Sequence, residues 1–340
     1  MARASQEFRK IELEQLAQDG AAGLAQALAI GCEPVILPGL CRDWPAVRAA
    51  RDGWAALSAY LVSFASERLG EAFVGAPAIE GRYDYGDGPD GFNFERQSLT
   101  LAQGLERIGE ASADRRLASV YMGSLPIEDY LPGFGADNRT DLLAPGVQPR
   151  AWLGNASRVA CHYDTYENLA CVVAGRRRFT LYPPDAVGAL YVGPIDHTLA
   201  GQPIALAVGA PAGDPRYPRF AAAADRARIV ELEPGDALFL PKLWWHQVEA
   251  LEPANMLVNY WWDGTAMGPD APYLTMMLAM TAIADRPPEE RAAWRAFFDH
   301  YVFRPDGHPL AHLPADRHGL LDKSAYGRVR ALVMRALRGG

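Results

Sequence analysis

The sequence predicts a mainly β protein whose core is an antiparallel barrel or jelly roll with flanking helices. Between residues 150 and 265, short runs of apolar and β-branched residues recur at near-regular spacing, separated by Pro and Gly. After residue 270, apolar residues follow the helical period instead. The chain has 340 residues, of which 49% are hydrophobic and 22% are charged, so it is long and apolar enough to bury such a core.

Residues 1–149 predict a mixed α/β extension that packs on the barrel. A helical pattern over 11–30 is interrupted at Gly20, and an apolar strand at 34–37 is ended by Pro38 and Gly39. Further patterns predict helices over 54–69 and 101–110 and strands over 72–74 and 118–122. Residues 79–96 are rich in Gly, Asp and aromatic residues, so we expect a long exposed loop there.

Residues 150–265 predict the jelly-roll core. The expected strands cover 151–153, 168–173, 178–182, 228–232, 237–240 and 256–262, and a Pro- and Ala-rich insertion occupies 193–227. Residues 266–340 predict a helical region, with helices over 273–286, 288–303 and 324–337. The second of these begins with Pro288, Glu289 and Glu290, which suit the first turn of a helix.

Charge and cysteine usage narrow the class of protein. Lys and Arg number 33 against 41 Asp and Glu, a net charge of −8, so we expect no nucleic-acid partner. No apolar run reaches the roughly 20 residues that a membrane helix needs, so we expect no membrane span. The four cysteines show neither CxxC spacing nor the clustering of a disulfide scaffold. Together with a polar N-terminus, these features predict a cytoplasmic protein.

The most informative stretch is 161–164, in which His162 and Asp164 are two residues apart. On a strand such residues point to the same face, so their side chains can converge. Of the other histidines, His246 is the one that follows a strand and a tight turn. Two His and one carboxylate leave three open positions on an octahedral ion, the arrangement of non-haem Fe(II) oxygenases. A lone His-x-Asp is more often a pair of solvated polar residues, so the prediction depends on His246.

Five segments in order resemble the JmjC and cupin-like group of Fe(II)/2-oxoglutarate oxygenases, near the asparaginyl hydroxylase that acts on hypoxia-inducible factor. The segments are 152–154, 162–168, 175–184, 234–246 and 259–262, preceded by an N-terminal element at 38–45. The resemblance covers residues 30–265. It implies that the core is a double-stranded β-helix, the cupin-like jelly roll.

The resemblance also implies roles for individual residues. His162, Asp164 and His246 would bind Fe(II), with 2-oxoglutarate taking two of the open positions and leaving one for O2. Arg177, fifteen residues after His162, would hold the far carboxylate of 2-oxoglutarate, and Tyr121 would donate to the same group. The residues lining the co-substrate pocket would be Asn168, Asn259 and Trp261.

Two positions depart from the pattern of these relatives. Arg177 stands where the asparaginyl hydroxylase has Lys; a guanidinium binds a carboxylate in a bidentate manner, but it is longer. Val159 stands where relatives often have Thr, which removes one hydrogen bond, worth about 0.5–1.5 kcal/mol. Both departures bear on co-substrate affinity.

The leading interpretation is therefore an oxygenase that hydroxylates a C–H bond, by default on a peptide or protein side chain, with a small molecule or a modified RNA base left open as substrate. The alternatives are a metal-dependent cupin isomerase or dioxygenase that does not use 2-oxoglutarate, and a catalytically silent binding module. The apolar residues of 272–303, Leu274 and Phe297 among them, predict a homodimer formed through the C-terminal helices.

Overall fold

The computed structural model describes residues 8–11, 28, 30–86, 91–144, 146–195, 198, 201–264 and 271–339. The chain divides into two compact units, Met1–Ala266 and Met267–Gly340, and each is described by itself. Most of the helical pattern predicted over 11–30 lies outside the described residues. The three-part division predicted from the sequence stays a prediction.

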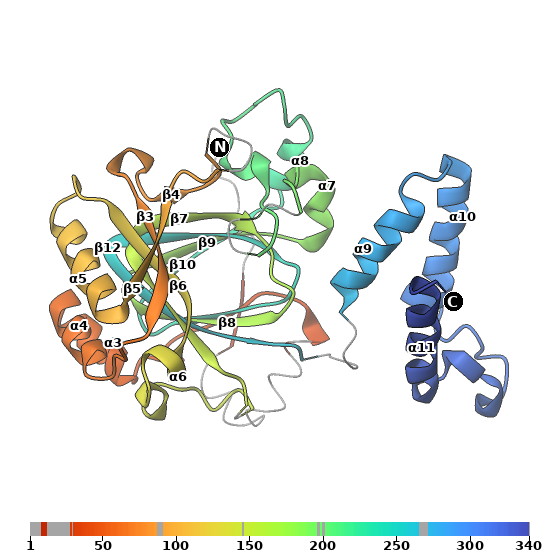
Figure 1. Cartoon of the computed structure of the whole chain (residues 1–340), viewed down its shortest axis with the longest axis horizontal. Helices are drawn as coiled ribbons and strands as arrows, with labels where there is room; N and C mark the ends of the chain where they lie inside the picture. Colours follow the sequence, from red (N-terminus) through yellow and green to blue (C-terminus); the bar gives the residue numbers. More distant parts are fainter. Residues whose placement is uncertain are drawn as a thin grey trace. The chain divides into compact units, whose positions relative to one another are not determined.

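The first unit is mainly β, as predicted, and its helices lie at the sides of the strands (Figure 1). Within the described residues twelve strands are hydrogen-bonded into one continuous sheet. Its strands are β1 (Arg9–Lys10), β2 (Val35–Leu37), β3 (Leu69–Gly75), β4 (Arg82–Tyr83), β5 (Glu95–Thr100), β6 (Ser119–Pro126), β7 (Pro149–His162), β8 (Glu167–Ala174), β9 (Arg177–Tyr182), β10 (Arg228–Leu232), β11 (Ala237–Leu240) and β12 (Trp245–Trp262).

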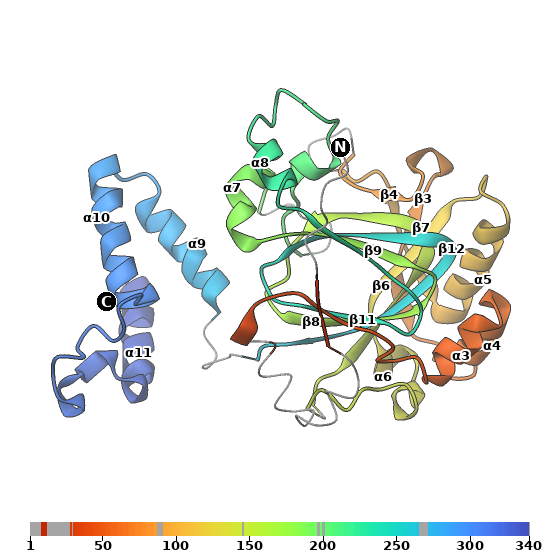
Figure 2. The same ribbon diagram turned by 180° about the vertical axis from the view of Figure 1, so that it is seen from behind.

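Two long strands, β7 and β12, fold this sheet into a jelly roll. The first half of β12 pairs with β9 and its second half with β8, while β7 runs antiparallel along both halves. The register between β12 and β7 shifts between Ala250 and Ala254, and such irregularities bend a strand pair. Figure 2 shows β7 and β12 side by side. The predicted jelly-roll core is thereby confirmed.

The interior between the layers is apolar. Strand β8 is buried along its whole length, as expected of a strand covered on both faces. Its residues Ala170 and Val172 face the interior, where they join Phe179 and Leu181 of β9. Alternate residues of β8 face the opposite way, into a second cluster formed with the N-terminal helices.

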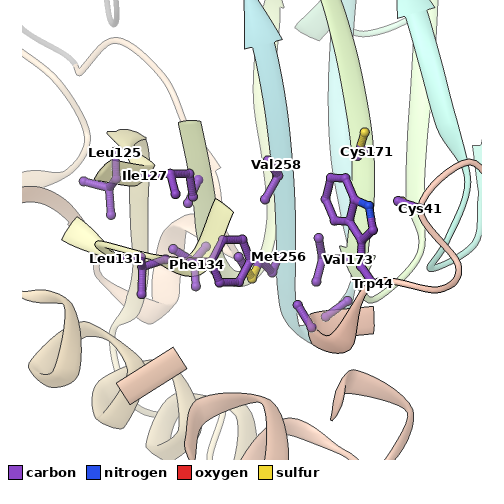
Figure 3. Close-up of a cluster of buried hydrophobic side chains, with 14 of the residues drawn as sticks. Cys41, Trp44, Leu125, Ile127, Leu131, Phe134, Cys171, Val173, Met256 and Val258 are labelled. Carbon is purple, nitrogen blue, oxygen red and sulfur yellow. The ribbon is translucent and has the colours of Figure 1, made fainter. Parts of the chain in front are cut away.

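That second cluster anchors the N-terminal segments to the sheet. It packs buried side chains of α3 (Pro45–Arg51), α4 (Trp54–Val62), α5 (Leu101–Ala113) and α6 (Ile127–Tyr130) against β8 and β12. Figure 3 shows Trp44 beside Cys171 and Val173, and Phe134 beside Met256. Fully burying one such side chain is worth about 1.5–3 kcal/mol. Helix α5 begins with a capping box in which Thr100 accepts from the Gln103 amide.

Several predicted boundaries were wrong. The helix predicted over 54–69 ends at Val62, and the preceding α3 was not predicted. Loop 79–96 contains the strand β4 and the start of β5. Strands β7 and β12 are far longer than the runs 151–153 and 256–262 that were predicted.

The insertion 193–227 packs on the outside of the jelly roll. Its described part contains η4 (Leu206–Gly209) and α8 (Phe220–Ala224), and α7 (Val187–Leu190) precedes it. Buried Ala205 and Ala223 contact Cys161, Tyr182 and Trp245 on the outer face of β7, β9 and β12.

The second unit is helical, with α9 (Pro272–Ile283), α10 (Pro288–Phe298) followed by the π-helical turn η5 (Asp299–Phe303), and α11 (Tyr326–Leu337). These helices match the predicted ones to within a few residues. Among the described residues, no helix is long and apolar enough to span a membrane.

Candidate metal centre

The ends of two paired strands bring His162, Asp164 and His246 together. His162 is the last residue of β7 and His246 the second residue of β12, and the two are direct partners in the antiparallel register. Direct partners point to the same face, which here is the interior because His246 is also opposite Leu181. The pairing thus delivers both imidazoles to the same end of the barrel.

Asp164 reaches this point differently from what the sequence predicts. Strand β7 ends at His162, so Asp164 lies in the turn before β8 and not on a strand face. The turn is held by the backbone N–H of Leu243, which donates to the Asp164 carbonyl at 2.8 Å. The loop before His246 therefore positions the turn that carries the carboxylate.

The geometry of the three side chains suits one metal ion. One donor atom from each of the three lies within 4.8 Å of the others, and this is the one such group of three or more in the described part of the chain. The Nε2 of His246 lies 3.7 Å from Oδ2 of Asp164, and the imidazole centroids are 4.3 Å apart.

Hydrogen bonds fix which imidazole nitrogen faces the centre. Nδ1 of His162 lies 2.9 Å from the Ala160 carbonyl, and Nδ1 of His246 lies 3.0 Å from the Trp244 carbonyl. A carbonyl only accepts, so each Nδ1 carries a proton, and in the neutral imidazole Nε2 then keeps the lone pair that binds a metal. This outer hydrogen bond is the usual companion of a metal-bound histidine.

The charge state of His246 also suits a ligand. Burial, and to a smaller extent the neighbouring His162, lower the pKa of His246 to about 4, although Asp164 opposes the shift. The imidazole is therefore neutral near pH 7, the form that binds metals. Two imidazoles and one carboxylate match the 2-His-1-carboxylate donor set of Fe(II), so the residues fit the ion that the sequence predicts.

Arg177 lies inside the barrel without an anionic partner. It is the first residue of β9, on the same face as Phe179 and Leu181, and it is 4% exposed. Its Nε has no hydrogen-bond partner, and no carboxylate of the described residues pairs with it. Burial lowers the pKa of the Arg177 guanidinium to about 10, so the group remains charged at pH 7.

The two neighbouring arginines behave oppositely. Arg176 pairs with Glu252 at 2.8 Å, and Arg178 pairs with Glu231 at 2.6 Å. Both side chains are about two-fifths exposed on the outer surface. Strand alternation therefore directs only the middle arginine inward, as the spacing from His162 predicts.

The remaining predicted co-substrate residues surround Trp152 on the inner face of β7. The Trp152 indole N–H donates to Asn259 Oδ1 at 2.6 Å, and Asn259 Nδ2 donates to Asn168 Oδ1 at 3.1 Å. The Trp152 ring also contacts Tyr121, with centroids 6.4 Å apart, and Trp261, at 5.6 Å. The structure thus connects these four predicted residues through one tryptophan.

Two further features of these residues suit the binding of a carboxylate. The indole N–H of Trp261 is buried without a partner, as is the Arg177 Nε. Burial raises the pKa of Tyr121 far above its usual value, although the nearby Arg177 opposes the shift, so Tyr121 is a neutral hydroxyl donor. Val159 adds no donor and packs with Tyr83 and Tyr121.

Trp152 was missed as a site residue by the sequence reasoning. The segment 152–154 was recognised as part of the resemblance, but no role was given to its tryptophan. Its role follows from the strand register, in which Trp152 is opposite Leu257 and so shares the face of Asn259 and Trp261.

Comparison with known proteins adds an independent finding. The model of a cupin-like domain matches residues 23–267. The chain is 35% identical over 117 residues to the lysine-specific demethylase JMJ31 of Arabidopsis thaliana, covering 34% of this chain and 21% of that protein. It is 32% identical over 155 residues to human HSPB1-associated protein 1, covering 44% and 31%. It is also 32% identical over 114 residues to the lysine-specific demethylase 8 of Xenopus tropicalis, covering 33% and 24%.

These matches span less than a third of each relative, whereas the family model spans well over half of this chain. The match includes all three candidate metal ligands and Arg177. The resemblance inferred from the motifs is confirmed, and the chain belongs to the JmjC and cupin-like domain family.

Proposed function

We propose that this protein is an Fe(II)- and 2-oxoglutarate-dependent oxygenase that hydroxylates a C–H bond of a peptide or protein side chain. Arg177 is the observation that carries the proposal. A His-Asp-His group alone would suit several cupin-like activities, but a buried, charged guanidinium without a partner requires an anion. The C5 carboxylate of 2-oxoglutarate is the anion that the resemblance assigns to this position.

The residues have distinct tasks in this proposal. His162, Asp164 and His246 would hold the Fe(II), which when bound activates O2 at the expense of 2-oxoglutarate. Arg177 would neutralise the far carboxylate of the co-substrate, and Tyr121 would donate a hydrogen bond to it. Trp152 and Asn259 would hold Asn168 and Trp261 in place through the contacts described above. The apolar interior excludes water from this region.

The alternatives make different predictions. An isomerase or a dioxygenase that does not use 2-oxoglutarate needs no partner for Arg177, and a silent binding module needs no intact set of three ligands. Succinate release from 2-oxoglutarate in the presence of Fe(II) and ascorbate separates the proposal from both. We expect release by the wild type and none by Asp164→Ala. A wild type that binds metal but never forms succinate, with or without cell extract, would contradict the proposal.

The substrate is proposed to be a protein or peptide. In support, one relative is named for association with HSPB1 and two are named as lysine-specific demethylases. Loop 79–96 and insertion 193–227 meet beside β7, where Tyr83 and Phe94 of the loop pack with Ile204 and Leu206 of the insertion. We propose that this junction contacts the substrate. Mass spectrometry of cell extract incubated with the loaded enzyme should reveal a peptide that gains one oxygen atom.

We also propose that the protein forms a homodimer through its C-terminal helices. In the described part of the second unit only Ala325 is buried. Leu274 is 66% exposed and Phe297 57% exposed, and large apolar side chains on all three helices are exposed in the same way. Contiguous exposed apolar surface of this kind marks an interaction site, and two-fold dimers are the commonest oligomers.

A cytoplasmic location is likewise a proposal. It is supported by the free, buried thiols of Cys41, Cys161 and Cys171, which suit a reducing compartment.

A further inference from the structure

A pocket of about 210 Å³ lies on the outer side of the jelly roll, between β4, β7 and the insertion. Its lining includes Ala160 and Cys161, which precede His162, and Gln247, which follows His246, but none of the three candidate ligands. Arg158 lines it from β7, where its register partner is Glu249, whereas Val159 packs with the interior aromatic residues. The pocket therefore does not include the candidate metal ligands, although Tyr83, Ile204 and Leu206 of its lining also belong to the junction beside β7 described above.

The charges of the lining residues favour an anion. Three arginines, Arg82, Arg158 and Arg216, line the pocket together with one acid, Asp84, although the chain as a whole has a net charge of −8. Arg216 is already paired with Asp214 at 2.7 Å. Arg82 lies 4.0 Å from Glu80, in an exposed pair.

Arg158 is the arginine of this group that has no ion-pair partner among the described residues. Among the described residues, no carboxylate lies within 4.0 Å of its side chain and no side-chain hydrogen bond is formed by it. Glu249, its partner in the strand register, is directed to Arg178 at 3.7 Å. A half-buried guanidinium at the wall of a pocket is thus left to interact with whatever occupies that pocket.

Gln247 provides a second, independent observation. Its side chain is 9% exposed and lines the same pocket, yet it has no hydrogen-bond partner among the described residues. The Gln247 amide is open to the pocket, so its N–H and its oxygen are available to an occupant. An amide N–H beside a guanidinium is a donor set for a carboxylate or phosphate oxygen.

We propose that this pocket, formed by Arg158, Gln247 and the insertion, binds a small carboxylate- or phosphate-bearing molecule. Pockets that enclose drug-sized ligands measure about 300–1,000 Å³, so a smaller anion fits this one. The pocket does not include Arg177, and the proposal holds whether or not the oxygenase activity is confirmed. Because Cys161 and Gln247 adjoin the two histidines, an occupant would contact the strand ends that position the metal ligands.

Calorimetric titration of the full-length, metal-free protein with citrate and with inorganic phosphate tests the proposal. We expect one of these anions to bind with one site per chain and to bind unchanged in Arg177→Gln, which removes the cation of the co-substrate site. Arg158→Gln should weaken binding at least about tenfold, as expected for the loss of a charged hydrogen-bond donor. The matched control is Arg48→Gln, an exposed arginine of α3 outside the pocket.

A second variant tests the pocket in case Arg158→Gln does not fold. A Cβ at Gly209 would lie 3.8 Å from the Arg158 guanidinium with no closer neighbour, so Gly209→Glu brings a carboxylate into the pocket. This variant should abolish anion binding while the thermal transition is retained. The proposal is overturned if neither anion binds at millimolar concentration, if Arg177→Gln abolishes binding, or if both pocket variants bind like the wild type.

Discussion

Replacement of Arg177 by Met separates binding of the co-substrate from folding. Arg177 is 4% exposed, makes no ion pair with the described residues and keeps its charge at pH 7. A carboxylate that loses its buried cationic partner loses about 2–5 kcal/mol of binding free energy. Since each 1.4 kcal/mol is a factor of ten, Arg177→Met should weaken 2-oxoglutarate binding roughly 30-fold to several thousand-fold.

The stability of the same variant should move the other way. In the protein without co-substrate, the buried charge of Arg177 is uncompensated, and burying an unpaired charge is unfavourable. Methionine fills a similar volume without the charge, so the free energy of unfolding should be unchanged or higher. Urea denaturation of the metal-free protein measures this quantity.

The assay is calorimetric titration of 2-oxoglutarate into protein loaded with Mn(II), which replaces the oxidisable Fe(II). Arg178→Met is the matched control, because Arg178 is on the same strand but forms an exposed pair with Glu231. Its effect on binding should be less than about fivefold, since exposed pairs contribute about 0–1 kcal/mol. The reasoning is refuted if Arg177→Met binds like the wild type, or if Arg178→Met is the sensitive variant.

The other predictions concern separate parts of the molecule. Trp152→Phe keeps the ring contacts but removes the hydrogen bond to Asn259, so the free energy of 2-oxoglutarate binding should weaken by about 0.5–1.5 kcal/mol in the same titration. An unchanged affinity would argue against a positioning role for Trp152. The double variant Leu274→Arg, Phe297→Glu should be monomeric in light scattering, where we expect the wild type to be a dimer, and it should keep its bound metal. If the wild type has the mass of a single chain at micromolar concentration, the dimer proposal is wrong. Thr100→Ala removes the cap of α5 and should lower the free energy of unfolding by about 0.5–2 kcal/mol in urea, whereas no change would show that the cap is dispensable.

The fold class could be predicted because the apolar strands of the core are continuous in sequence. The lengths of β7 and β12 could not, since polar residues interrupt their patterns. Asn155 is an example: its side chain accepts from the Val120 amide and donates to the carbonyls of Ile108 and Pro253. Such polar residues are acceptable in a buried strand only because distant segments supply hydrogen-bond partners for their side chains, and a single sequence does not reveal those partners.

The residues of the candidate site could be predicted from the sequence, but the way in which the fold positions Asp164 could not. The spacing of His162 and Asp164 and the strand and turn before His246 identified the candidate metal ligands, and the resemblance assigned Arg177 to the co-substrate. The position of Asp164 depends on a hydrogen bond from Leu243, which lies in the left-handed region at φ 67°. That conformation is set by tertiary contacts, because a bulky residue does not adopt it by preference.

The outer pocket was not predictable either. Arg158 and Gln247 lie outside the strands predicted over 151–153 and 256–262, so no sequence pattern indicated where their side chains point. They become a candidate site because the insertion covers them, and the course of an insertion depends on packing and not on local pattern.

The central claim is that His162, Asp164 and His246 hold one metal ion, and anaerobic Fe(II) titration of the purified apo-protein tests it most directly. The wild type should bind one Fe(II) per chain, as should the control Asp185→Asn, an exposed carboxylate that pairs with Arg226. His162→Ala and Asp164→Ala each leave two ligands and should lose the ion at the same concentration. Full occupancy in both variants would contradict the account.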